Sequence, residues 1–74
     1  MAITNPSLIA ASAATTAATG AENKVKALGT ALFAAAMAES SSARPMTASA
    51  QTKVTALNTE FVANAAEFQT ALGL

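Results

Sequence analysis

The sequence predicts an all-α protein, folded as an antiparallel helical hairpin with a long N-terminal helix. Alanine is the most abundant of its 74 residues, and alanine has the highest intrinsic helix propensity. The larger apolar side chains recur at a helical period in two segments of the chain. One cluster of helix-breaking residues, at 40–46, separates those segments. Two helices joined by a short break are expected to pack side by side and antiparallel.

The first predicted helix covers about residues 6–39, after a short tail at 1–5, and residues 6–74 form one domain. Asn5 is a favoured N-cap residue, and Pro6 suits the first helical position because its missing N–H would be unpaired there anyway. Before Gly20, the tract 10–21 holds only Ala, Ser and Thr. Gly20 is the residue that could kink or break this helix.

The second half of this helix is predicted to be amphipathic. Its apolar stripe is formed by Val25, Leu28, Leu32 and Phe33, with Gly29 and Ala36 on the same stripe. Glu22 and Lys26 are four residues apart on the opposite side, in the orientation that favours an ion pair.

The predicted turn at about 40–46 contains three serines and Arg44 before a proline, a residue pair that disfavours helix. The second helix is predicted at about 47–72, capped by Thr47 or Ser42 at its start and by Gly73 at its end. Its apolar stripe steps by three or four residues through Val54, Leu57, Phe61, Ala65, Phe68 and Leu72.

These two stripes supply the candidate subunit-packing residues: Leu28, Leu32, Phe33, Val54, Leu57, Phe61, Phe68 and Leu72. We expect the three phenylalanines to lie in the seam of the hairpin, and the alternative is insertion of a phenylalanine into a neighbouring subunit. The second helix is too short to cover all of the first. Apolar surface is therefore expected to remain for a partner.

Two segments leave alternatives open. The tract 10–21 is either a flexible leader or a helix that becomes ordered on assembly. The sparse charged residues, Glu22, Lys24, Lys26, Lys53, Glu60 and Glu67, are expected on a solvated face, with ion pairs between subunits as the alternative.

Composition argues against several classes of function. The chain has no Cys, His or Asp, so we expect no catalytic site, no metal and no cofactor. Its formal net charge is zero and it has no Tyr or Trp, which disfavours nucleic-acid binding. We therefore expect that the protein is not an enzyme and that it acts by packing against other protein.

Membrane insertion and export by a cleaved signal are also not expected. The best apolar run, at 27–38, is shorter than the roughly 20 residues of a membrane-spanning helix. The first basic residue, Lys24, follows the only stretch that could serve as the apolar part of a secretory signal.

This pattern resembles the filament subunits of bacterial type III secretion systems, which are the needle proteins and the Hrp pilins. The resemblance covers the whole chain: the Ala/Ser/Thr-rich N-terminal part, the Ser/Pro-containing turn at 40–45 and the striped helix at 47–72. It implies an uncleaved N-terminal secretion signal, for which residues 1–20 have a suitable composition. The composition is closer to that of the Hrp pilins.

The resemblance implies a secreted virulence protein that polymerises into an extracellular pilus on the bacterial surface, a conduit for effector proteins. Its partners would be copies of itself and a secretion chaperone. One alternative is a helical hairpin of the type VII pathway, similar to the Ala-rich PE class, that acts as a dimeric partner-binding module. Another is a phage or conjugative-pilus subunit, which needs a longer uncharged helix than this chain has.

Overall fold

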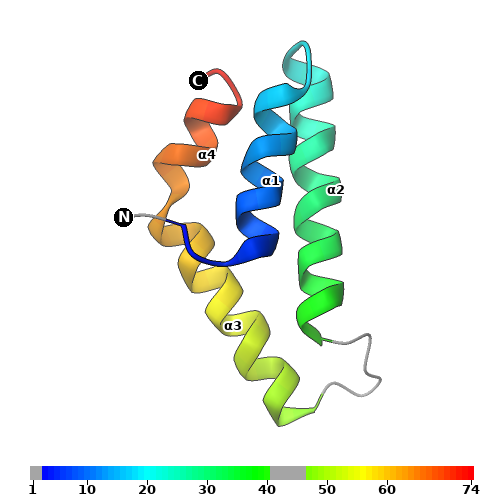
Figure 1. Cartoon of the computed structure of the whole chain (residues 1–74), viewed down its shortest axis with the longest axis vertical. Helices are drawn as coiled ribbons and strands as arrows, with labels where there is room; N and C mark the ends of the chain where they lie inside the picture. The colour runs from blue at the N-terminus through cyan, green and yellow to red at the C-terminus, as the bar shows by residue number, and fades with distance from the viewer. Residues whose placement is uncertain (1–2, 41–46) are drawn as a thin grey trace.

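The computed structural model describes residues 3–40 and 47–74, and these residues form four α-helices (Figure 1). They are α1 (Pro6–Ala17), α2 (Ala21–Ser40), α3 (Ala48–Ala63) and α4 (Ala65–Ala71). The all-α class is confirmed. α2 runs antiparallel to α1, α3 returns along α2, and α4 continues from α3, so that α1 lies between α4 and α2 (Figure 1).

The molecule measures 37 × 24 × 15 Å. Its shortest dimension is little more than the diameter of one helix, about 10–12 Å with side chains. The helices therefore lie side by side in a thin slab, and each of them keeps a large part of its surface in contact with solvent.

α1 begins where the sequence predicts. The Asn5 side chain accepts hydrogen bonds from the N–H groups of Ser7 and Leu8, at 2.9 and 3.3 Å, and Pro6 occupies the first turn. These bonds satisfy two of the N–H groups that a helix start leaves without an intrahelical partner.

The prediction of one continuous helix over 6–39 is wrong. Residues 18–20 break it, with Ala18 extended at the end of α1 and Gly20 at a φ of +83°. Glycine adopts this left-handed backbone without the steric cost that a Cβ brings. The break reverses the chain, so that the alanine-rich face of α1 packs on α2. The tract 10–21 is thus mostly helical within the single chain.

The second predicted helix also consists of two. Thr47 caps α3 by accepting from the N–H of Ala50 at 3.1 Å, as expected. The helix is interrupted at Asn64, whose side chain is buried and donates to the carbonyl of Glu60 at 2.9 Å. Asn64 does not belong to the apolar stripe of the predicted second helix, yet the structure buries it.

α4 ends at the predicted glycine. Gly73 has a φ of +84°, its N–H donates to the Thr70 carbonyl, and the N–H of Leu74 donates to the Gln69 carbonyl. This is the hydrogen-bond pattern of a Schellman motif. The predicted turn, with Arg44, falls almost wholly at 41–46, outside the described residues.

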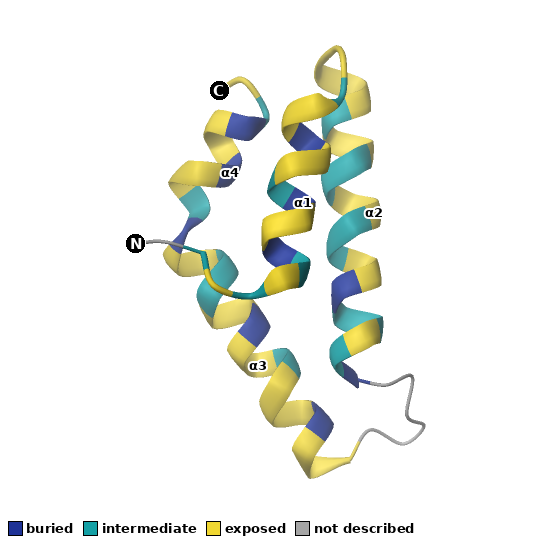
Figure 2. Ribbon diagram, viewed as in Figure 1, coloured by how far each residue is buried: buried dark blue, intermediate teal, exposed yellow. Residues whose placement is uncertain are grey.

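The core is small and lies where α1 meets the other helices (Figure 2). Its buried members are Leu8, Ala11, Ala35, Leu57 and Phe68. Thr15 is also fully buried, and its hydroxyl donates to the Ala11 carbonyl at 2.7 Å, which satisfies its polar group. Two of the five buried apolar members are alanines, so the core buries little apolar area for its number of residues.

We expect Gly20→Ala to destabilise the bundle by about 1–2 kcal/mol, because a Cβ at positive φ is strained. Gly73→Ala is the matched control. The two glycines have nearly the same φ, and a Cβ at either position meets no atom within 4 Å. Strain at Gly73 is relieved by fraying of the last residues, whereas Gly20 sets the chain reversal. Urea unfolding followed by circular dichroism should show the larger loss for Gly20→Ala, and equal losses would contradict this role.

Candidate interaction surface

Two charged side chains hold the helices of the slab together, and one of them is Glu60 near the end of α3. Its carboxylate accepts the N–H of Asn5 at 2.8 Å, the N–H of Thr4, and the Thr4 hydroxyl at 3.2 Å. These backbone hydrogen bonds favour the ionised form and lower the pKa of Glu60 below its ordinary value. Glu60 was predicted on a solvated face; instead it ties the start of α1 to α3.

The second is Lys24, in the first turns of α2. Its ammonium donates to the carbonyls of Thr15 and Thr16 at 3.1 and 3.0 Å, and to the carbonyl of Ala71 at 3.2 Å. These carbonyls lie in the last turns of α1 and α4, where a cation is electrostatically favourable. Lys24 therefore joins three helices, a role that the expectation of a solvated side chain missed. The predicted Glu22–Lys26 ion pair is confirmed at 3.3 Å on the surface.

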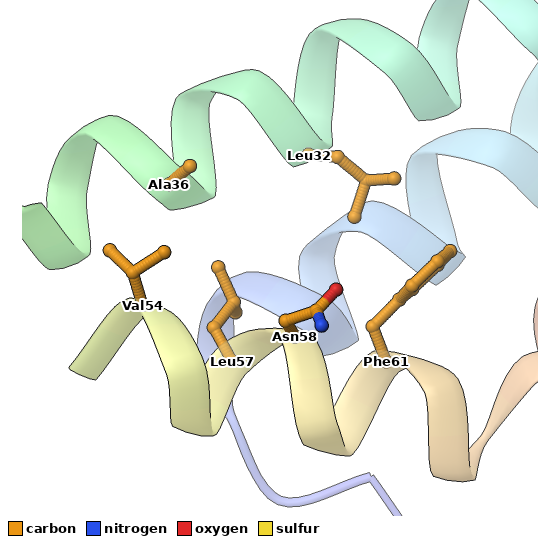
Figure 3. A pocket seen from close by; sticks show the side chains of 6 residues that line it. All are labelled: Leu32, Ala36, Val54, Leu57, Asn58 and Phe61. Carbon is orange, nitrogen blue, oxygen red and sulfur yellow. The ribbon is translucent and has the colours of Figure 1, made fainter. Parts of the chain in front are cut away.

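An apolar groove lies between α2 and α3, with a volume of about 230 Å³. It is lined by Leu32, Ala36, Val54, Leu57, Asn58 and Phe61, whose side chains project into the space between the two helices (Figure 3). Asn58 is the one polar residue in this lining. The phenyl ring of Phe61 closes one end and packs on that of Phe68, with ring centroids 4.7 Å apart.

The outer side of α2 carries two of the most exposed large apolar residues in the described parts of the chain. Phe33 is 69% exposed and Val25 is 61% exposed. Phe33 directly follows Leu32, a residue of the groove, so the exposed side and the groove are adjacent on α2. Ile9, Val62 and Leu74 are also exposed.

The structure separates the predicted packing residues into three groups. Leu57 and Phe68 are buried in the core, and Leu28, Leu32 and Phe61 are half-buried against it. Val54 and Leu72 belong to the same half-buried group. Phe33 is exposed, so its expected place in the seam of a hairpin is wrong. The seam itself is replaced by contacts of α1 with α2 and α4 and of α2 with α3.

Exposed Ile9 and Val62 were not among the predicted packing residues. Ile9 lies in the Ala/Ser/Thr-rich part of the chain, and Val62 sits off the helical stripe beside Phe61. A single apolar residue off a stripe is common on protein surfaces, and the sequence held no signal that would have singled these two out.

The described residues offer no group of three or more acidic, Cys or His side chains that could hold a metal ion. Among the same residues, no helix is long and apolar enough to cross a membrane. The groove and the outer side of α2 are apolar surfaces suited to contact with protein.

Comparison with known proteins adds no relative: the chain matches no protein-family model, no curated protein and no solved structure.

We expect the Glu60 contact to make stability depend on pH. Because the folded-state pKa is lowered, the contribution is present above the pKa of the unfolded chain, about 4.3 for Glu. It is lost as the pH falls through the lower folded-state value. Glu60→Gln should lower the free energy of unfolding at pH 7 and flatten its decline in acid, measured by urea unfolding from pH 7 to pH 2. Glu67→Gln, an exposed residue of α4, should retain the decline; identical profiles for the two variants would contradict the assignment.

Lys24→Met keeps the apolar stem but removes the ammonium from the three carbonyls. We expect a loss of about 1–2 kcal/mol, since hydrogen bonds from a charged donor are among the stronger ones. Lys26→Met, which removes only the surface ion pair, should cost no more than about 0.5 kcal/mol. Thermal unfolding of both variants measures the difference, and an equal effect would show that Lys24 does not join the helices.

Proposed function

We propose that the chain is a structural subunit that associates with copies of itself, and that it is secreted and forms an extracellular filament of a type III secretion system, a conduit for effector proteins. The observation that carries the self-association is the apolar surface that the single chain leaves open along α2 and the α2–α3 groove. The filament and its secretion system come from the resemblance in composition and pattern.

Surface area supports association. A protein of 7.3 kDa is expected to expose about 4,200 Å² by the scaling of surface with mass. The bundle exposes 4665 Å². Exposed apolar residues account for part of this surface, and their burial against another protein would stabilise a chain whose own core is small.

Charge supports association between copies in particular. The chain has four basic and four acidic residues, and its formal net charge is zero. Identical subunits therefore carry no net repulsion to overcome when they approach each other. The lining of the groove holds no charged residue that contact would have to desolvate.

A filament of the resembled kind is built from hairpins with long helices, and the bundle differs from such a hairpin at residues 18–20. If this segment straightened, α1 and α2 would form one helix and would expose Leu8 and Thr15, which the bundle buries. Those residues would then pack against neighbouring subunits. In this proposal the bundle is the unassembled state, and Gly20 is the hinge.

The test is assembly of the purified wild-type protein over a wide concentration range, followed by sedimentation velocity and negative-stain electron microscopy. We expect a monomer at low concentration and particles that lengthen as concentration rises. A discrete dimer that never lengthens would exclude the filament and favour the dimeric, type VII-like alternative. A monomer at every concentration would exclude self-association altogether.

A further inference from the structure

α1 occupies a site that the rest of the chain builds for it, between α2 and α4. Its Leu8, Ala11 and Thr15 are fully buried there, and Glu60 accepts the N–H groups that precede its first turn. Residues 18–20 join α1 to α2. The occupant of this site is thus a segment that every copy of the chain carries. The α1 of a second copy can make the same contacts.

The break at 18–20 leaves backbone carbonyls at the end of α1 without the N–H groups of a following turn. In the bundle, the Lys24 ammonium donates to two of them, those of Thr15 and Thr16, at 3.1 and 3.0 Å. If residues 18–20 became helical, α1 and α2 would form one straight helix, and these carbonyls would accept backbone N–H groups four residues on. Straightening therefore exchanges these two hydrogen bonds for helical ones.

The contact between α1 and α2 follows one stripe of that straight helix. Six of the residues that line the crevice between α1 and α2 have steps of three, four or a whole number of heptads plus three: Ser7, Ala10, Ala14, Ala31, Ala35 and Ala38. They occupy the a and d positions of a single heptad repeat. The remaining a and d positions are Ala17, Ala21, Lys24 and Leu28. The stripe thus keeps its phase through residues 18–20, although these residues reverse the chain in the bundle.

Two such straight helices would pair symmetrically. Because α1 and α2 are antiparallel (Figure 1), the stripe residues of α1 face those of α2 in reverse order. The Asn5 amide donates to Glu39 at 3.2 Å near one end of this contact, and Lys24 donates to Thr15 near the other. In the same register, α1 of each copy meets α2 of the other, with a two-fold axis near residues 22–23, the midpoint of the stripe. The exchange is therefore reciprocal and closed.

We propose that two copies of this chain exchange α1, so that each places its α1 between α2 and α4 of the other while residues 18–20 become helical. This inference rests on the self-association proposed above and names its first step. The burial of Leu8, Ala11 and Thr15 and the hydrogen bonds of Glu60 are then made between chains. The exchange leaves the outer side of α2 and the α2–α3 groove open, and through these surfaces dimers add to one another.

Gly20 sets the balance between the closed chain and the exchanged dimer. Glycine tolerates the φ of +83° in the closed chain and disfavours a helix interior, and alanine reverses both preferences. Since both chains of a dimer gain, we expect Gly20→Ala to raise dimer affinity at least about 100-fold in sedimentation equilibrium. Gly73→Ala is the matched control, because Gly73 has a φ of +84° outside the hinge. It should leave the affinity unchanged.

A distance within one chain distinguishes exchange from association of closed bundles. Ile9→Cys and Thr30→Cys place two spin labels on exposed positions of α1 and α2 in a chain without other cysteines. In the closed chain the labels lie within about 20 Å, since packed helices are about 8–10 Å apart. In a straight helix they are about 32 Å apart, at 1.5 Å per residue. Dilution with excess unlabelled wild-type protein restricts electron–electron resonance to the distance within one chain.

We expect the short distance at low total concentration and the distance of about 32 Å as dimers form. Dimers or larger particles that keep the short distance would overturn the exchange and leave self-association through another surface intact. An affinity that is equal in Gly20→Ala and Gly73→Ala would also overturn it. If wild-type protein and Gly20→Ala both stay monomeric at every concentration, the exchange and the proposed self-association are both wrong.

Discussion

The reversal of the chain at residues 18–20 is the constraint on which the rest of the structure depends. Gly20 takes a left-handed backbone there, and α1 consequently folds back along α2. Without that reversal Leu8, Ala11 and Thr15 would have no neighbours on α2 to bury them, and the core would lose two of its five buried apolar members, Leu8 and Ala11. The positions of Glu60 and Lys24, which join the two ends of α1 to the other helices, follow from the same reversal.

An alanine-rich chain forms helices readily, but the core that these helices build is small. Alanine stabilises each helix through its backbone propensity, but it buries little area when helices pack. The bundle compensates with two charged side chains. Glu60 accepts hydrogen bonds from backbone N–H groups at the start of α1. Lys24 donates hydrogen bonds to backbone carbonyls at the ends of α1 and α4. The larger apolar residues are too few to fill the space between α2 and α3 and also cover the slab. A groove and the exposed Phe33 are the result.

The sequence predicted the helical class, the starts of α1 and α3, and the end of α4, because each depends on local chemistry: Asn5 with Pro6, Thr47 and Gly73. The break at Gly20 was recognised only as a possibility, since local propensity does not show whether α1 gains more by packing on α2 than by continuing it. The burial of Asn64 and the exposure of Phe33 were missed for the same reason. Both depend on which helix lies opposite, and that is fixed by contacts between residues far apart in the sequence.

The central proposal is that the outer side of α2 is free in the monomer and covered when copies of the chain associate. Phe33 reports on it directly, because the chain has three phenylalanines and no Tyr or Trp. Fluorine NMR of protein labelled with fluorophenylalanine, recorded over a concentration series, resolves each ring. We expect the Phe33 resonance to shift as concentration rises, while that of Phe68, which is buried in the core, stays constant. An assembly that forms with no change at Phe33 would contradict this proposal.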